Sequence, residues 1–280
     1  MPRIRLDLAY DGGGFAGWAA QPGQRTCQGE LERALTTIAR EPVRVTVAGR
    51  TDAGVHASGQ VAHADVPEAL VPADAALAQR LALRLSRLAA PEGDLVVRAV
   101  GLAPAGFDAR FSAVSRSYRY RILASPAGDP LERRTAAHVP QPLDVDAMRR
   151  TAEALVGLRD FAAFCKPREG ATTIRELREF SWQQQSTAQQ GALLTASLTA
   201  DAFCHSMVRA LVAACVRVGE GRLGLARAIA LLDELARSPL TGLMPAHGLT
   251  LVGVGYPPDD LLAQQAERAR ALRSASDITD

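Results

Sequence analysis

The chain has 280 residues, which is enough for one large domain or two smaller ones. It is 48% hydrophobic and 22% charged, with a mean hydropathy near zero. This composition is typical of a globular protein with a sizeable core and excludes a disordered tail protein. No run approaches the roughly 18 consecutive apolar residues of a membrane-spanning helix. The first residues show no signal-peptide pattern, so we expect a cytoplasmic protein.

The net charge of +2 does not by itself indicate a polyanionic partner. The basic residues are unusual in kind, because Lys166 is the only lysine among 32 lysines and arginines. The planar guanidinium of arginine suits phosphate and carboxylate. The four cysteines form no CxxC pair, so we expect neither a structural zinc nor a disulfide framework, but reduced and mostly buried thiols. They are Cys27, Cys165, Cys204 and Cys215.

Hydrophobic periodicity in the first half predicts the element order strand, helix, strand, strand, helix, strand. The predicted elements cover residues 4–10, 27–39, 43–47, 59–66, 74–89 and 94–101. This order is the ferredoxin-like βαββαβ pattern.

The second half repeats the order without detectable sequence similarity. Strands are predicted over 117–123, 173–184, 191–201 and 247–256, and helices over 144–156, 203–218 and 225–236. We therefore expect an α+β fold of two ferredoxin-like (βαββαβ) halves, with a mixed, largely antiparallel sheet and helices on one side. A groove between two such halves suits a large substrate, and strand faces that carry arginine and aromatic residues suit RNA, so we also expect a central RNA-binding cleft. The expected domains are 1–105, 106–258 and a polar C-terminal tail, 259–280.

The loop GRTDAGVHA, residues 49–57, lies between the second and third predicted strands. It places Asp52 two residues after Arg50 and four residues before His56. A nearby positive charge favours the ionised carboxylate, and an ionised, positioned carboxylate is a competent nucleophile or base. The structural alternative is a turn-forming aspartate. An aspartic protease would need a second such motif, which the sequence lacks.

A second group of candidates is FDARF, residues 107–111, followed by the predicted strand that carries Tyr118 and Tyr120. On a strand the two tyrosines share one face, and Arg119 and Arg121 share the other. Aromatic rings interleaved with arginines can stack an unpaired base and neutralise phosphates. The alternative is a half-buried strand with a solvated arginine face.

Arg209 lies in the apolar run that follows Asp201. An unpaired buried charge is costly, so we expect a carboxylate partner, for which Asp52 would serve. A structural salt bridge elsewhere is the alternative. Two other functional classes stay open: a non-catalytic RNA-binding protein, and a cysteine hydrolase that uses Cys165 or Cys204.

Taken together, several segments resemble the bacterial tRNA pseudouridine synthase A (TruA) family. The resemblance extends from the first strand to about Pro258. It rests on YDG at 10–12, GW at 17–18, GRTDAGVHA at 49–57, GQVAH at 59–63, ARFSA at 109–113, RSYRYRIL at 116–123, FCHSMVR at 203–209 and PAHGL at 245–249.

The resemblance implies isomerisation of uridine to pseudouridine at positions 38, 39 and 40 of the tRNA anticodon stem-loop. It also implies a homodimer, no cofactor and no metal. Asp52 falls on the family's catalytic aspartate, Tyr118 on its substrate-contacting tyrosine, and Arg50 on the arginine of the catalytic loop. Arg209 falls on the basic residue that meets the aspartate.

Arg110 and His56, from the same motifs, complete the expected substrate-binding set. The chain departs from the usual family run ANAFLHHMVRN at four positions, and a histidine is common where Asp108 stands. The four replacements are Asp201, Cys204, Ser206 and Ala210.

Overall fold

The computed structural model describes residues 1–168, 170–187, 191–271 and 277–278. The chain folds into two compact units, which are described one at a time. Unit 1 is Met1–Val114 with Leu251–Ala271, and unit 2 is Ser115–Thr250 with the described residues 277–278. The division into domains over 1–105, 106–258 and 259–280 stays a prediction, and so does the RNA-binding cleft.

Unit 1 has the predicted βαββαβ order. It comprises β1 (Arg3–Tyr10), η1 (Gly12–Gly14), α1 (Cys27–Ala39), β2 (Val45–Val47), β3 (His56–Asp65), η2 (Glu68–Leu70), α2 (Ala75–Ala89) and β4 (Leu95–Leu102). The strand order is β4–β1–β3 with antiparallel pairing, and β2 pairs with β3. The chain returns to this unit with β10 (Leu249–Gly255), η6 (Asp259–Leu261) and α6 (Leu262–Arg268).

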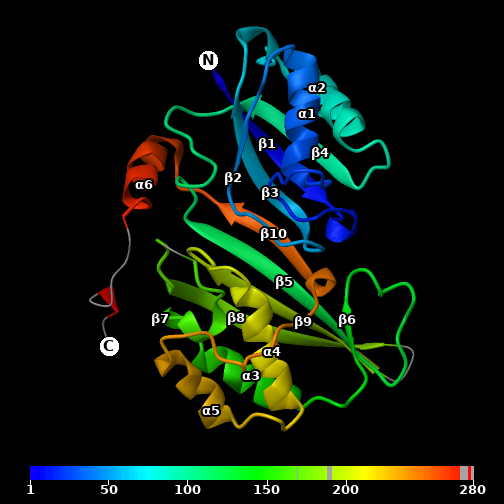
Figure 1. Ribbon diagram of the computed structural model, residues 1–280, viewed down its shortest axis with the longest axis vertical. Helices are drawn as coiled ribbons and strands as arrows, with labels where there is room; N and C mark the ends of the chain where they lie inside the picture. Colours follow the sequence, from blue (N-terminus) through cyan, green and yellow to red (C-terminus); the bar gives the residue numbers. More distant parts are fainter. Residues whose placement is uncertain (169, 188–190, 272–276, 279–280) are drawn as a thin grey trace. The chain divides into compact units, whose positions relative to one another are not determined.

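The alternation in β1 explains how this sheet acquires its core. Every second side chain, from Ile4 to Tyr10, is buried, whereas the intervening ones, such as Arg5, are half-exposed. α1 begins where the Thr26 side chain accepts a hydrogen bond from the backbone N–H of Gly29, a standard N-cap. α1 and α2 pack against each other on one face of the sheet (Figure 1).

Unit 2 contains β5 (Ser115–Ala124), β6 (Ala137–Val139), α3 (Val145–Ala154), β7 (Gly157–Asp160), η3 (Ala162–Phe164), β8 (Ile174–Thr187), β9 (Gly191–Ala200), α4 (Met207–Gly219), α5 (Leu225–Ala230), η4 (Leu231–Asp233) and η5 (Ala246–Gly248). The strands β5, β9, β8 and β7 are antiparallel in that order, and β6 pairs in parallel with β5. α3 packs on α4 and along β8 (Figure 1).

The α+β prediction is confirmed, with most strand pairs antiparallel. The helix predicted over 203–218 begins only at Met207, because Ser206 has a left-handed backbone (φ 66°) that a helix cannot continue. The helix predicted over 225–236 is shorter and ends in a 3-10 turn. β6 and β7 were not predicted, because neither contains three alternating apolar residues like those that marked residues 43–47.

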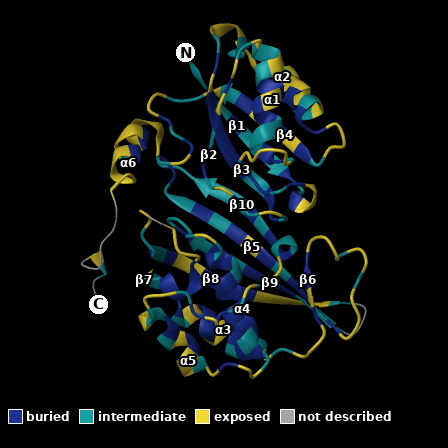
Figure 2. Cartoon of the chain, viewed as in Figure 1, coloured by how far each residue is buried: buried dark blue, intermediate teal, exposed yellow. Residues whose placement is uncertain are grey.

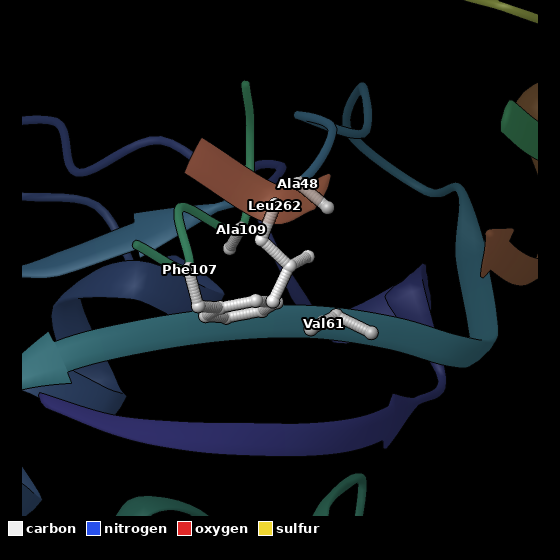
Figure 3. Close-up of a cluster of buried hydrophobic side chains, with 5 residues drawn as sticks. All are labelled: Ala48, Val61, Phe107, Ala109 and Leu262. Carbon is white, nitrogen blue, oxygen red and sulfur yellow. The ribbon is translucent and has the colours of Figure 1, made fainter. Parts of the chain in front are cut away.

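Burial follows these elements closely (Figure 2). α4 is the most enclosed helix of unit 2, with buried side chains around most of its circumference. In unit 1, Leu262 of α6 reaches onto the ring of Phe107 in a small cluster with Ala48, Val61 and Ala109 (Figure 3). The start of the predicted polar tail is therefore anchored to a core. In the described part of the chain, no helix combines the length and apolar composition that crossing a membrane requires.

Candidate active site

Asp52 lies on the loop between β2 and β3 of unit 1, and its side chain is half-buried. The backbone N–H of Val55 donates to the carbonyl of Asp52 at 3.1 Å, which closes a turn. Gly54, within this turn, has a left-handed backbone (φ 77°), which explains the glycine. Arg50 is exposed on the same loop. A charged, accessible arginine and a half-buried carboxylate thus lie two residues apart.

The loop rests on the segment that follows β1. The backbone N–H of Trp18 donates to the carbonyl of Thr51 at 3.0 Å. A Cβ atom on Gly12 would lie 2.0 Å from the carbonyl oxygen of Val55. Gly17 has φ 94°, and a Cβ there would lie 3.1 Å from the carbonyl oxygen of Thr51. The YDG and GW motifs therefore leave space for the backbone of the loop.

His56 is buried at the start of β3, and its Nδ1 lies 3.0 Å from two groups. One is the backbone nitrogen of Gly12, and the other is Oδ1 of Asp11. A single ring nitrogen cannot accept from the first and donate to the second at once. We assign the bond to Gly12, because its N–H is always a donor and Asp11 Oδ1 already accepts from Gly13. The other ring nitrogen, Nε2, would then make the predicted contact of His56 with substrate.

Arg110 is exposed beside Phe111, with its guanidinium carbon 4.8 Å from the ring centroid. Arg270 lies at the same distance from this ring. Asp108 Oδ1 accepts from the backbone N–H groups of Arg110 and Phe111, each at 2.9 Å. Asp108 therefore forms the turn that presents Arg110.

In unit 2, Tyr118 and Tyr120 point to the same buried face of β5, and Arg119 is exposed, as predicted. Tyr120 is fully buried, and its hydroxyl donates to the carbonyl of Pro245 at 2.7 Å. Burial raises the pKa of Tyr120. Tyr118 contacts Phe203 edge to face, with ring centroids 5.2 Å apart. Tyr120 is thus a core residue, and Tyr118 is the tyrosine nearer the 201–206 turn.

Arg209 lies in the first turns of α4. Its Nε donates to the carbonyl of Met244 at 2.7 Å, and the backbone N–H of Met244 donates back to the carbonyl of Arg209 at 3.3 Å. The preceding turn is held by Asp201, whose Oδ1 accepts from the backbone N–H of Glu176 at 2.9 Å. Arg209 belongs to unit 2 and Asp52 to unit 1, and their pairing stays a prediction.

The expectation of reduced, mostly buried thiols is confirmed for Cys27 and Cys215 and wrong for the other two cysteines. Cys165, at the end of η3, forms a disulfide with Cys204, with Cα atoms 5.7 Å apart. Cys27 and Cys215 are free and buried, and burial raises the pKa of each thiol to about 12. The disulfide was missed because its members are 39 residues apart, and no local spacing indicates the pair.

The structure thus places Arg50 and Asp52 on the loop before β3 and His56 at the start of β3, all in unit 1, with Arg110 in the same unit. It places Tyr118 and Arg209 in unit 2. Sequence patterns alone did not reveal Phe203 as the neighbour of Tyr118. Within the residues that the structure describes, no group of three or more histidine, cysteine, aspartate or glutamate side chains is arranged to hold a metal ion.

Residues 151–257 match a family model described as tRNA pseudouridine synthase. That range contains Arg209 but not the Asp52 loop. A solved chain from the "Crystal Structure of a Cbf5-Nop10-Gar1 Complex" is 10% identical, with a TM-score of 0.33. The match covers 90% of this chain and 59% of that chain, and its score is too low to assign a function.

Curated relatives match over nearly their whole length. A tRNA pseudouridine synthase A from Leifsonia xyli subsp. xyli is 52% identical, covering 97% of this chain and 98% of the relative. One from Frankia casuarinae is 54% identical, covering 98% and 96%. One from Corynebacterium glutamicum is 49% identical, covering 99% and 97%. At this identity and coverage, the chain belongs to the tRNA pseudouridine synthase A family.

Proposed function

We propose that this protein isomerises uridine to pseudouridine at positions 38, 39 and 40 of the tRNA anticodon stem-loop, with Asp52 as the catalytic nucleophile. The family makes the chain an isomerase that forms pseudouridine in tRNA. The three positions, the role of Asp52, a homodimer and a cytoplasmic location are parts of the proposal.

The observation that carries the proposal is the Asp52 loop, whose backbone is fixed on both sides of a half-buried carboxylate. Pseudouridine formation breaks the glycosidic bond between C1′ of the ribose and N1 of uracil, turns the base and forms a bond from C1′ to carbon 5. Carbon 5 loses its proton and N1 gains one. The overall change is an isomerisation, so nothing is oxidised and no group is donated from outside. An ionised, positioned carboxylate can act as the nucleophile in the cleavage step.

The other residues bind the RNA in this proposal. The target nucleotide must leave its stack to reach a carboxylate. Tyr118 contacts the displaced base, and Arg209 pairs with Asp52. Arg50 and Arg110, both exposed in unit 1, hold the distorted sugar-phosphate backbone through their planar guanidinium groups.

The test is incubation of the protein with unmodified tRNA, followed by mapping of pseudouridine by chemical adduct and primer-extension stops. We expect stops at positions 38, 39 and 40 in tRNAs that carry uridine there. Asp52→Asn should bind tRNA and leave less than about a thousandth of the activity, because the carboxylate oxygen that attacks is lost.

Asp74→Asn is the matched control. Asp74 caps α2 by accepting from the backbone N–H of Leu77, and asparagine caps a helix equally well. The control should keep the parent activity. Activity of Asp52→Asn within tenfold of the parent would remove Asp52 from the mechanism, and stops at other positions would contradict the proposed specificity.

A further inference from the structure

We infer that a buried chain of three side chains, Gln60, Tyr10 and Thr51, positions the Asp52 loop for the reaction. These are positioning residues, since they act through the backbone next to Asp52. The inference rests on the proposed role of Asp52 and adds the groups that fix its place.

The three side chains form one hydrogen-bonded path from β3 through β1 to the loop. The amide Nε2 of Gln60 donates to the Tyr10 hydroxyl at 3.1 Å and to the carbonyl of Gly49 at 2.8 Å. The Tyr10 hydroxyl lies 2.7 Å from Oγ1 of Thr51. Because Gln60 donates to the tyrosine oxygen, the tyrosine proton is available to Thr51. Thr51 immediately precedes Asp52.

The path is closed to solvent. Gln60 is 0% exposed, Tyr10 5% and Thr51 7%. The Oε1 atom of Gln60 accepts from the backbone N–H of Val61 at 3.2 Å, so its amide oxygen is paired as well. Buried polar groups that lose a partner are costly, which gives such a network a single preferred arrangement. The loop is thereby tied at Gly49 and at Thr51.

The pairing of β1 with β3 has an irregularity at this network. β1 and β3 pair Leu8 with Gln60 and Tyr10 with Ala57, so β3 has one residue more than β1 between these pairs. Such a bulge redirects side chains and is common beside active sites. Tyr10 and Gln60 belong to neighbouring pairs at this irregularity and lie within hydrogen-bond distance of each other.

Backbone contacts hold the loop a second time at Thr51 and also at Val55. The backbone N–H of Trp18 donates to the carbonyl of Thr51, and Gly12 packs against the carbonyl of Val55. The Asp52 carboxylate is thus presented by a backbone that is held before and after it. A reacting group displaced by about 1 Å can lose about a hundredfold in rate, so removal of one hydroxyl from this network should slow the chemistry without weakening tRNA binding.

The experiment compares Tyr10→Phe, Thr51→Val and the double variant with the parent. The single-turnover rate on unmodified tRNA, the tRNA dissociation constant and the thermal midpoint are measured for each. We expect each single variant to lose about tenfold to a hundredfold in rate, with the dissociation constant within about twofold. Because both remove the same bond, the double variant should be no slower than the slower single one. Thr51→Ser keeps the hydroxyl and should recover most of the rate.

Tyr120→Phe is the matched control, because it also removes a buried tyrosine hydroxyl that makes a hydrogen bond. It should show a comparable loss of thermal midpoint and no loss of rate. The inference is overturned if Tyr10→Phe reacts within twofold of the parent, if the losses of the two singles multiply, or if Tyr120→Phe is equally slow. An active Asp52→Asn refutes the proposed function itself, whereas an inactive Asp52→Asn beside a fast Tyr10→Phe refutes only the positioning.

Discussion

The ring of Phe203 meets the ring of Tyr118 edge to face, with the two planes at 89°. Phe203 lies in the turn before α4, whereas Tyr118 lies in β5. The contact fixes the Tyr118 ring through a residue of the turn that Asp201 and the disulfide also hold. The orientation of Tyr118 therefore depends on a segment distant from it in sequence.

Substitution of Tyr118 should separate stacking from any part played by its hydroxyl. Tyr118→Phe keeps the ring and should retain most tRNA binding, whereas Tyr118→Leu should lose about 1–3 kcal/mol of binding, the worth of one base–aromatic stack. Phe203→Leu should lose less, about 0.5–1.5 kcal/mol, because it removes only the edge contact. Filter binding at fixed salt measures the tRNA affinity of the three variants, and the turnover of Tyr118→Phe shows any part played by the hydroxyl. Parent-like binding by Tyr118→Leu would contradict the proposed role.

Local patterns predicted the elements whose cause is local. Apolar residues at helical spacing predicted a helix over 27–39, which are the residues that α1 occupies, and in the structure Thr26 caps this helix. The alternation around Tyr118 and Tyr120 likewise gave the correct faces of β5. The features that the sequence could not show depend on partners distant along the chain. Tyr10 and Thr51 are 41 residues apart, and the turn before α4 is held by Asp201, which accepts a hydrogen bond from the backbone N–H of Glu176.

Arg209 should support both stability and activity. Its Nε donates to the carbonyl of Met244, and removal of a charged donor from a partly buried carbonyl costs about 1.5–3 kcal/mol. Arg209→Leu should therefore lower the free energy of unfolding by about this amount and slow turnover. Arg209→Lys should recover only part, because an ammonium group has no donor at the Nε position. Denaturant titration and the tRNA assay measure the two effects, and a stable, active Arg209→Leu would contradict both.

The Cys165–Cys204 disulfide should stabilise the fold, because it closes a loop with a sequence separation of 39. Cross-links of this size contribute about 2–4 kcal/mol. A reductant should lower the free energy of unfolding of the parent by about this amount and leave a Cys165→Ser/Cys204→Ser variant unchanged. Thiol titration in denaturant without reductant should detect only Cys27 and Cys215. Detection of all four thiols would show that the disulfide does not form.

The pH dependence of stability near neutrality should depend on His63. This side chain is buried in β3, and its Nδ1 accepts from the backbone N–H of Ala109 at 2.9 Å, which requires the neutral ring. Burial, assisted by the charge of Arg3, lowers the pKa of His63 below its ordinary value of 6.5. Hydrogen bonding to Arg3 lowers the pKa of the Asp65 carboxyl group, so protonation of Asp65 changes the stability only at more acidic pH.

The direction of this pH dependence follows from proton uptake, since the unfolded chain binds a proton at His63 more readily than the folded chain does. The contribution of the neutral His63 ring to stability is complete above about pH 6.5, the ordinary pKa of histidine. This contribution is lost as the pH falls through the lowered pKa of His63. The free energy of unfolding should therefore decrease between about pH 7 and pH 5. His63→Gln keeps an acceptor for Ala109 and does not titrate, so its stability should change less over this interval. Urea titrations at several pH values compare the two proteins, and parallel curves would show that another group is responsible.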